Sequence, residues 1–401
     1  PELLLFASVI ARDDYKRALA YVKRALAADP QFAMAAGSAG QFHAYLGDFE
    51  AANLALKRCV EASPLAYGCL MNQSWIDEQH GRCRAIEAAA RLLIASQPDS
   101  HVGYQILAES LAGLGQPVEA IGEAYAQLRS VMPKDTRALA KTEHDLALAL
   151  VAGRFDRALV HLDALATTLE KSKMRDDHAR VAKLRVRIML ETGDTKEAAK
   201  VADAFLRRVH AWEVDPNLED FAISKAATPH MLRALRLAGV IDTHTMSTRI
   251  DDWIAAWTRR GVPTNMRGFL WLHGHATATS DRADAEWALA QRAAFQPIPP
   301  FRPQTLAEVA IGRTYLLADK PSEAVTWLKR ATRSCKRLID PIGHTQAFSL
   351  LGQALEQTHA TPAACAAYAT VIERWGEAKP RSESASRAHQ RKIALRCPPA
   401  Q

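Results

Sequence analysis

The chain has 401 residues, of which 48% are hydrophobic and 24% are charged, as is ordinary for a folded globular protein. Its 51 basic and 44 acidic residues leave a formal charge of +7 that is spread along the chain, so no nucleic acid is expected as a partner. No window approaches ~18 consecutive apolar residues, so we expect no membrane span.

The first six residues, PELLLF, are apolar and have neither an initiating methionine nor a basic region before them. This pattern does not fit a signal peptide. We interpret it as a helix cut from a longer polypeptide.

Proline and glycine recur at one constant step of 34 residues in the first part of the chain. A period of this length is typical of helix–turn–helix units that stack into a solenoid. The fold is therefore predicted to be all-α, an α-solenoid of antiparallel helix pairs wound into a right-handed superhelix. The recurring residues are Pro30, Pro64, Pro98, Gly47, Gly81 and Gly115.

Second helices of the pairs follow an acidic residue and stop at a proline, as in 14–30 and 48–64. A small residue recurs in the middle of these helices, and we expect two helix backbones to cross closely there. Ile86 is the one large residue on this track. The small residues are Ala18, Ala52, Ala120, Ala158, Ala198, Ala324 and Ala364.

The repeat weakens between residues 211 and 304, and it returns in 305–397. We therefore divide the chain into N-terminal repeats (1–210), a divergent helical segment with a proline-rich connector (211–304), and C-terminal repeats with a capping helix (305–397). The connector is Gln296–Pro303, expected to be extended. The divergent segment is rich in tryptophan and contains Trp212, Trp253, Trp257, Trp271 and Trp287.

The step, the closing glycines, the small residue and the closing proline resemble the tetratricopeptide repeat family. The phrases FRP at 301–303, AIGRTYLL at 310–317, ACAAY at 364–368 and RWG at 374–376 resemble the C-terminal repeat region of large serine/threonine protein kinases of the myxobacterial type. In that family a kinase domain precedes the repeats. The resemblance implies a bacterial signalling protein and a regulatory, cytoplasmic region of a kinase.

No catalytic motif is present in the sequence. It lacks GxGxxG, HRD and DFG, as well as a Walker loop, a GxSxG elbow and an HExxH helix, so we expect no enzyme and no cofactor in this chain. The best metal candidate is His273 with His275, and with His230 and His244 upstream. No carboxylate or thiol stands at ligand spacing, so we expect no metal site.

Recognition of a protein or peptide partner is the function that remains. First helices line the concave face of a repeat stack, and helical phase places seven residues on it. Each of these residues could instead pack against the protein or face water. The predicted groove residues are Gln41, Met71, Asn72, Trp75, Glu78, Ile106 and Glu109.

Two functions stay open at this point. One is a non-catalytic interaction scaffold, and the other is a small-molecule sensor of a signalling or transcription regulator with its pocket in the tryptophan-rich segment. A closed apolar cavity near Trp253, Trp257 and Trp271 would favour sensing, whereas an open groove would favour a protein partner.

None of the six cysteines belongs to a CxxC motif. Cys59 ends one helix and Cys69 begins the next, so the two could come within disulfide range, while Cys83 should be out of their reach. We nevertheless expect reduced thiols, because Cys59 continues the buried stripe of Ala52 and Leu56 and because the cytoplasm is reducing.

Overall fold

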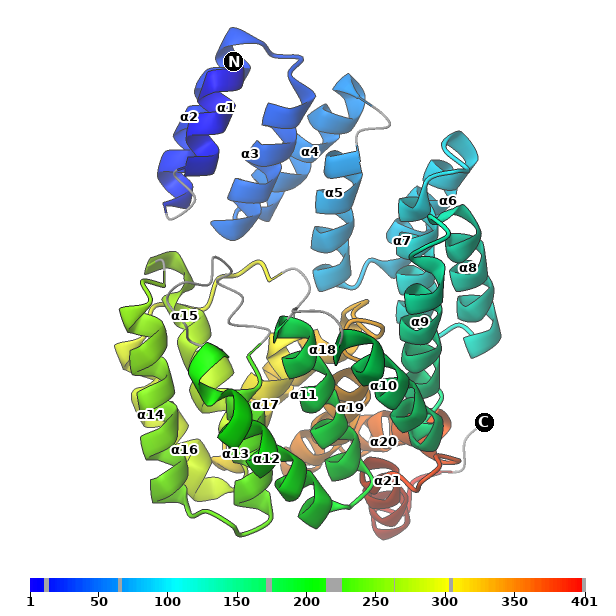
Figure 1. Cartoon of the computed structure of the whole chain (residues 1–401), viewed down its shortest axis with the longest axis vertical. Coiled ribbons are helices and arrows are strands. Elements are labelled where there is room, and N and C mark those ends of the chain that lie inside the picture. The colour runs from blue at the N-terminus through cyan, green and yellow to red at the C-terminus, as the bar shows by residue number, and fades with distance from the viewer. Residues whose placement is uncertain are drawn as a thin grey trace.

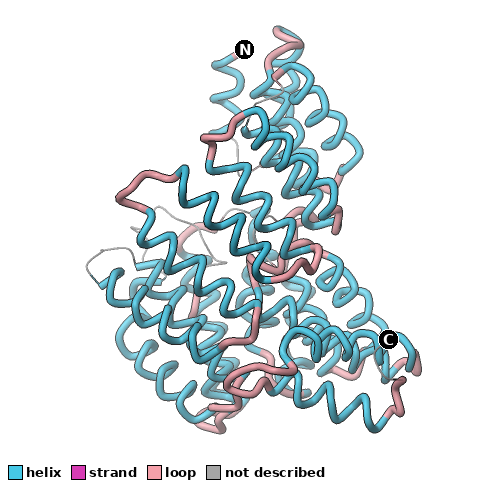
Figure 2. The backbone as a smooth tube through the Cα atoms, turned by 90° about the vertical axis from the view of Figure 1, so that its right-hand side faces the viewer, coloured by secondary structure: helices cyan, strands magenta, loops and turns pink. Residues whose placement is uncertain are grey.

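A computed structural model of the chain describes residues 1–10, 14–63, 67–170, 175–213, 226–262, 264–302 and 306–398. Within these ranges the regular structure is entirely helical, and no strand occurs (Figures 1 and 2). The predicted all-α solenoid of helix pairs is confirmed. Pro64 and Pro303 lie outside the described residues.

The first half of the chain consists of α1 (Glu2–Ile10), α2 (Tyr15–Ala28), α3 (Ala33–Tyr45), α4 (Phe49–Ala62), α5 (Tyr67–His80), α6 (Cys83–Ser96), α7 (His101–Gly113), α8 (Val118–Val131), α9 (Arg137–Val151), α10 (Phe155–Glu170), α11 (Arg175–Glu191) and α12 (Thr195–Glu213). The second half consists of α13 (Thr228–Leu237), α14 (Thr243–Arg259), η2 (Thr264–Met266), α15 (Arg267–Leu270), η3 (Trp271–Ala276), α16 (Arg282–Gln291), η4 (Arg292–Ala294), α17 (Ala307–Leu317), α18 (Pro321–Arg333), α19 (Pro341–Gln357), α20 (Thr361–Trp375) and α21 (Glu383–Ala394).

Local sequence explains where these helices start and stop. The carboxylate of Asp14 accepts hydrogen bonds from the first backbone amides of α2, and Asp48 does the same for α4. Gly81 and Gly115, which follow α5 and α7, have φ angles of +73° and +75°. Glycine adopts this left-handed conformation without a steric penalty, so it can turn the chain directly into the second helix of the pair.

The small-residue track is buried as predicted, with one exception. Ala120 is only partly buried, and Ile121 lies in the core instead. The residue before α6 is Arg82, and the residue before α8 is Pro117. These two caps are one residue further apart than the 34-residue step, so each position of α8 is shifted by one residue. The members with no exposed surface are Ala18, Ala52, Ala158, Ala198, Ala324 and Ala364.

Figure 1 shows α1–α5 as an arm above the rest of the molecule, with α6–α9 beside it and α10–α21 below. Consecutive helices pack on one another along most of the chain, as a solenoid requires. Among the described helices, none has the length and apolarity needed to cross a bilayer.

The lower part of the solenoid closes into a ring, a feature that the repeat pattern did not predict. The indole of Trp375, at the end of α20, donates to the carbonyl of Leu150 in α9 at 3.2 Å. The ring of Trp375 also packs edge-on against Phe155, the first residue of α10. The carboxylate of Glu191 in α11 accepts hydrogen bonds from the hydroxyls of Ser382, which caps α21, and Ser384, in the first turn of α21. The last repeats therefore contact the helices from α9 to α11, so that α9–α21 form the ring.

In the described part of the tryptophan-rich segment before the connector the regular structure is helical, and its helices α13–α16 take part in the ring. Trp253, Trp257 and Trp271 are nearly completely buried. They lie in side-chain clusters with neighbours such as Val262 and Leu272. Of Trp212, only the helical backbone is described.

The expectation of reduced cysteines is wrong, because the structure pairs all six. Cys59 is bonded to Cys69, Cys83 to Cys335, and Cys365 to Cys397. The Cys83–Cys335 pair joins residues 252 positions apart and so links α6 to the segment after α18.

Candidate functional site

The predicted groove lies on α3, α5 and α7, and the structure divides its seven residues between two environments. Gln41, Met71 and Asn72 are partly exposed. Trp75 and Glu109 are also partly exposed, whereas Glu78 and Ile106 are buried. Trp75, Glu78 and Ile106 lie against later segments of the chain. We call the surface formed by these seven residues the inner face.

The connector before α17 lies against the arm and is held through its backbone. The amide nitrogen of Gln79 donates to the carbonyl of Pro300 at 2.6 Å, and its amide oxygen accepts from the backbone N–H of Arg302 at 2.8 Å. One side chain thus satisfies a donor and an acceptor of the same short segment. This contact depends on the backbone and not on the identity of the bound side chains.

Phe301, between these two bonds, anchors the connector in an apolar site. Its side chain is 1% exposed and lies in a cluster with Leu56 and Ile76, against which Trp75 packs. The ring of Tyr45 meets Phe301 edge-on at a centroid distance of 5.3 Å. Trp75 therefore has a packing role toward the chain's own connector.

The segment after α18 occupies a second part of the inner face. The backbone N–H of Cys335 donates to the carbonyl of Glu78 at 2.9 Å, next to the Cys83–Cys335 disulfide. Ile106 is buried in the cluster that contains Cys335. A Cβ on Gly81 would lie 2.3 Å from the carbonyl oxygen of Arg333, so the two backbones touch here. We call this contact between 78–83 and 333–337 the joint.

Buried charges accompany the joint. The Lys336 side chain is 1% exposed, and its amine donates to the carbonyl of Arg302 at 2.6 Å. Arg302 forms a buried ion pair with Glu308. Burial would raise the pKa of Glu308, but Arg302 and then Lys336 outweigh this effect and hold that pKa below its usual value.

At Glu78, unlike at Glu308, burial outweighs the neighbouring positive charge. Burial raises the pKa of Glu78 to about 8, with Lys336 opposing the shift and the neighbouring Glu109 adding to it. One oxygen of the Glu78 carboxyl is buried without a hydrogen-bond partner among the described residues. Glu78 and Glu109, which were predicted to contact a partner, thus lie near each other, and Glu78 also lies near Lys336.

The residues that sequence reasoning missed are Gln79, Phe301 and Lys336. Gln79 directly follows Glu78, but helical phase does not show that a connector from 221 residues later in the chain meets it. The proline-rich composition of Gln296–Pro303 was the available signal, because such segments are suited to binding as extended chains.

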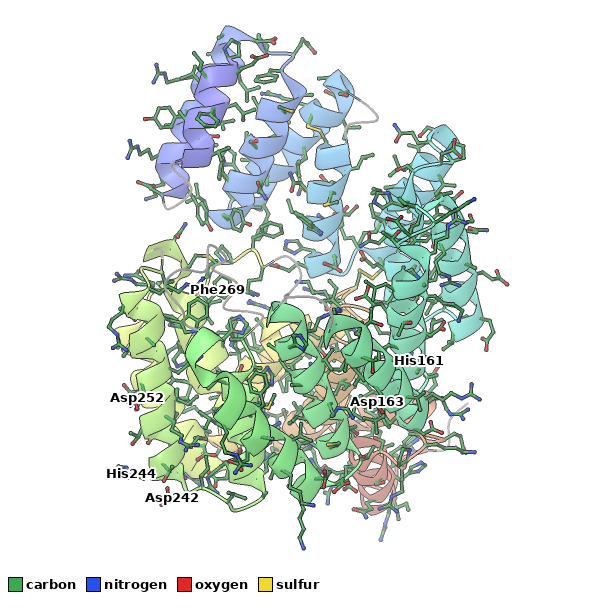
Figure 3. All side chains as sticks on the ribbon, viewed as in Figure 1. His161, Asp163, Asp242, His244, Asp252 and Phe269 are labelled. Atoms are coloured by element: carbon green, nitrogen blue, oxygen red, sulfur yellow. A yellow bond between two sulfur atoms is a disulfide. The ribbon has the colours of Figure 1, made fainter. Side chains whose placement is uncertain are left out.

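The histidines considered for metal binding do not form one site. His244 is exposed at the start of α14, beside Asp242 (Figure 3). His273 and His275 lie in η3. Among the residues that the structure describes, no three His, Cys, Asp or Glu side chains are grouped as metal ligands. Burial lowers the pKa of His273 to about 3 and that of His275 to about 4, so both imidazoles are neutral at pH 7.

No protein-family model matches the sequence, and no curated protein matches it at a significant level. Among solved structures, the chain is similar to one in the structure of Naa15/Naa10 bound to HypK-THB, with 16% identity over 96% of this chain and 55% of that chain and a TM-score of 0.30. It is also similar to a chain of the APC/C hetero-tetramer Cut9–Hcn1, with 12% identity over 98% of this chain and 86% of that chain and a TM-score of 0.33. A third similar structure is the TPR domain of P58(IPK), with 13% identity over 99% of both chains and a TM-score of 0.24.

This chain covers 55% of the first of these structures. With TM-scores from 0.24 to 0.33, these likenesses carry no argument about function. The function has to be inferred from the repeat pattern and from the packing of the chain itself.

Proposed function

We propose that this chain is a non-catalytic scaffold of tetratricopeptide-like repeats that binds a segment of a protein partner on its inner face. The observation that supports this proposal is the way the chain holds its own connector. Gln79 pairs with the backbone on both sides of Phe301, and an apolar site receives the Phe301 side chain. A surface that binds one chain segment by its backbone and one aromatic anchor can bind another segment beside it.

The part of the inner face proposed for the partner contains Gln41, Met71 and Asn72. All three are partly exposed, and they lie on α3 and α5, which contact each other. Trp75 is less suited to a binding test, because its removal would also disturb the packing around Phe301.

The test combines partner capture from the parent proteome with two variants. Met71→Glu with Asn72→Arg changes the inner face, and Leu54→Glu changes the exposed outer side of α4, where Leu54 is 54% exposed. The proposal expects the first variant to lose the partner and the second to retain it. Retention by the inner-face variant, with loss in Leu54→Glu, would place the binding surface on the outside of the solenoid.

The narrower proposal is that the chain is the C-terminal region of a bacterial serine/threonine kinase of the myxobacterial type. Its support is the resemblance of the short phrases around Phe301, Tyr315 and Trp375. Reading the parent gene upstream of the codon for Pro1 tests it. A kinase domain with HRD and DFG motifs is expected, and an upstream region without them would refute the kinase assignment.

Small-molecule sensing in the tryptophan-rich segment is not favoured. Trp253, Trp257 and Trp271 have 1–2% of their surface exposed, and they are packed against apolar neighbours. Large aromatic side chains buried in this way stabilise a core.

The disulfides bear on the compartment. The expectation of a cytoplasmic location came from the kinase resemblance and implied reduced thiols, whereas all six cysteines are paired. We propose an oxidising compartment instead, because disulfides form and persist there. Peptide mapping of native protein, alkylated at once without reductant, tests this, and free thiols at all six cysteines would contradict it.

A further inference from the structure

Four basic side chains from neighbouring helices of the ring lie close enough to affect one another's charge. Arg187 comes from α11, His230 and Arg233 from α13, and Arg313 from α17. Helix α11 contacts α13, α13 contacts η3, and η3 contacts α17, so the four residues line one continuous stretch. Each of them is partly exposed.

The two arginines from α13 and α17 meet at Thr279. The Nε of Arg233 donates to the backbone carbonyl of Thr279 at 3.0 Å. The Nε of Arg313 lies 3.4 Å from the Thr279 hydroxyl, and one of its terminal nitrogens donates to the carbonyls of Ala276 and Thr277. The two guanidinium groups are therefore close together, although both are cations.

The electrostatic surroundings of this cluster are positive. Burial, and then the charges of Lys183, Arg187, Arg313 and Arg233, hold the pKa of His230 well below its usual value. Burial, Arg233 and Arg187 likewise lower the pKa of Arg313. Burial and Arg187 lower the pKa of Arg233 to about 10, with only Asp284 opposing them.

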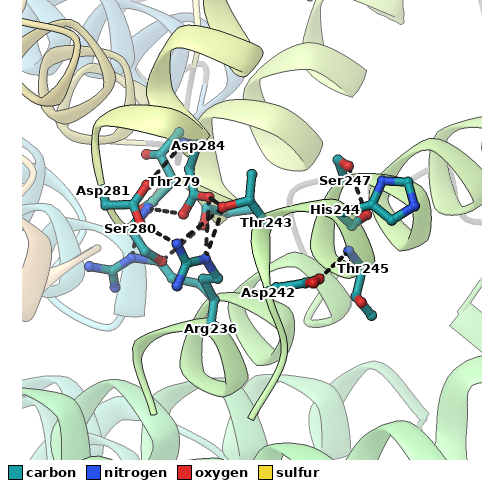
Figure 4. Close-up of polar contacts among 12 residues, drawn as sticks. Arg236, Asp242, Thr243, His244, Thr245, Ser247, Thr279, Ser280, Asp281 and Asp284 are labelled. Atoms are coloured by element: carbon teal, nitrogen blue, oxygen red, sulfur yellow. Dashed lines mark hydrogen bonds and ion pairs between the residues drawn. The ribbon is translucent and has the colours of Figure 1, made fainter. Parts of the chain in front are cut away.

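Acidic groups near the cluster are already engaged. Asp340 pairs with Arg187 at 2.7 Å. Asp284 accepts from the hydroxyl of Thr243 at 2.8 Å and from the N–H of Ser280 at 3.0 Å, and its other neighbour is Arg236 at 3.4 Å (Figure 4). Neither carboxylate pairs directly with Arg233 or Arg313 among the described contacts, so neither guanidinium has an ion-pair partner of its own there.

Hydrogen-bond donors also remain available. No described group accepts from the two terminal nitrogens of Arg233, from the second terminal nitrogen of Arg313, or from His230. Cations held close together repel one another, and a bound anion offsets that repulsion. Guanidinium groups present paired N–H donors in the geometry that carboxylate and phosphate oxygens accept.

We propose that this inner stretch of the ring binds a small multivalent oxyanion, of the phosphate or polycarboxylate class, with Arg233 and Arg313 as its main ligands and Arg187 and His230 beside them. The site is separate from the inner face of the arm, and it does not depend on the proposed scaffold function. A ligand here would contact α11, α13 and α17 together and would tie successive repeats of the ring to one another.

The test is calorimetric titration of the full chain with pyrophosphate and with citrate at constant ionic strength, with chloride as the background anion. The key variant is Arg233→Gln. Arg236→Gln is its matched control, because Arg236 lies one turn further along α13 and is already paired with Asp281 and Asp284. The parent and Arg236→Gln should bind the anion, and Arg233→Gln should bind it at least tenfold more weakly.

Unfolding without ligand supplies the second measurement. Arg233→Gln should be at least as stable as the parent, since it removes one of several repelling cations, whereas Arg236→Gln should be less stable because it leaves two carboxylates unpaired. If Arg233→Gln does not fold, Arg233→Lys takes its place, keeping the charge but losing the paired donors.

Binding of pyrophosphate alone would assign the phosphate class, and binding of citrate alone the polycarboxylate class. The proposal is overturned if neither anion binds the parent more tightly than chloride does, or if the Arg236 control loses binding as much as the Arg233 variant.

Discussion

Substitution of Gly81 by alanine tests whether the joint holds the arm against the ring. Gly81 has φ +73°, and a Cβ there would lie 2.3 Å from the carbonyl oxygen and 2.7 Å from the Cγ of Arg333. Gly115 is the equivalent residue one repeat later. It has φ +75°, and a Cβ there would meet nothing within 4 Å. The two glycines therefore share the same backbone strain and differ in what surrounds them.

Gly115→Ala should cost about 1–2 kcal/mol, the usual penalty for a side chain in the left-handed conformation. Gly81→Ala should carry the same penalty and also overpack the joint, which typically adds about 1–3 kcal/mol. Urea unfolding of both variants gives the two free energies. Non-reducing alkylation of the same samples should show less Cys83–Cys335 disulfide in Gly81→Ala only. Equal losses of stability in the two variants, with the disulfide intact in both, would refute the joint.

Three further predictions concern packing and pH. Phe301→Ala should lower the unfolding free energy by about 3–5 kcal/mol, as expected for a buried aromatic, whereas Phe6→Ala, at 64% exposure, should be nearly neutral. Ala52→Leu should lower the thermal midpoint by overpacking α3 against α4 at a cost of about 1–3 kcal/mol, and Ala366→Leu on the exposed side of α20 should not. The folded-state pKa of Glu78, raised from 4.5 to about 8, means that the native protein holds a proton there that the unfolded chain releases, so stability should fall as pH rises across this range. Between pH 5 and 8, the unfolding free energy of Glu78→Gln should decrease less with rising pH than that of the parent. The unfolding free energy of the exposed control Glu50→Gln should decrease as much as that of the parent.

The repeat made the local structure predictable. Three features act within a single helix pair: the aspartate caps, the closing glycines and the small residue in each second helix. They recur with every repeat, so the sequence is enough to predict them. The one-residue error at Ala120 has the same local origin, because Pro117 shifts the start of α8. The tripartite division at 210/211 and 304/305 stays a prediction.

Contacts between distant repeats could not be predicted in this way. A period of 34 residues describes how each helix pair meets its neighbour, and it contains nothing about contacts with a pair far along the chain. The Cys83–Cys335 disulfide, with its sequence separation of 252, depends on how far the whole solenoid curves. The same holds for Phe301 on the arm and for Glu191 at the closure of the ring. Cys59 and Cys69 were correctly placed within disulfide range, but their reduced state was inferred from the buried position of Cys59 and from an assumed compartment, and neither excludes a bond between them.

Disulfide mapping tests most directly whether the solenoid folds back so that its α5–α6 turn lies against the segment after α18. Protein secreted into an oxidising compartment would be alkylated, digested without reductant and analysed by mass spectrometry. The structure predicts one cross-linked peptide pair containing Cys83 and Cys335, in addition to the Cys59–Cys69 and Cys365–Cys397 pairs. Cys83 linked to Cys59 or Cys69, or an alkylated Cys83 together with an alkylated Cys335, would contradict the closure.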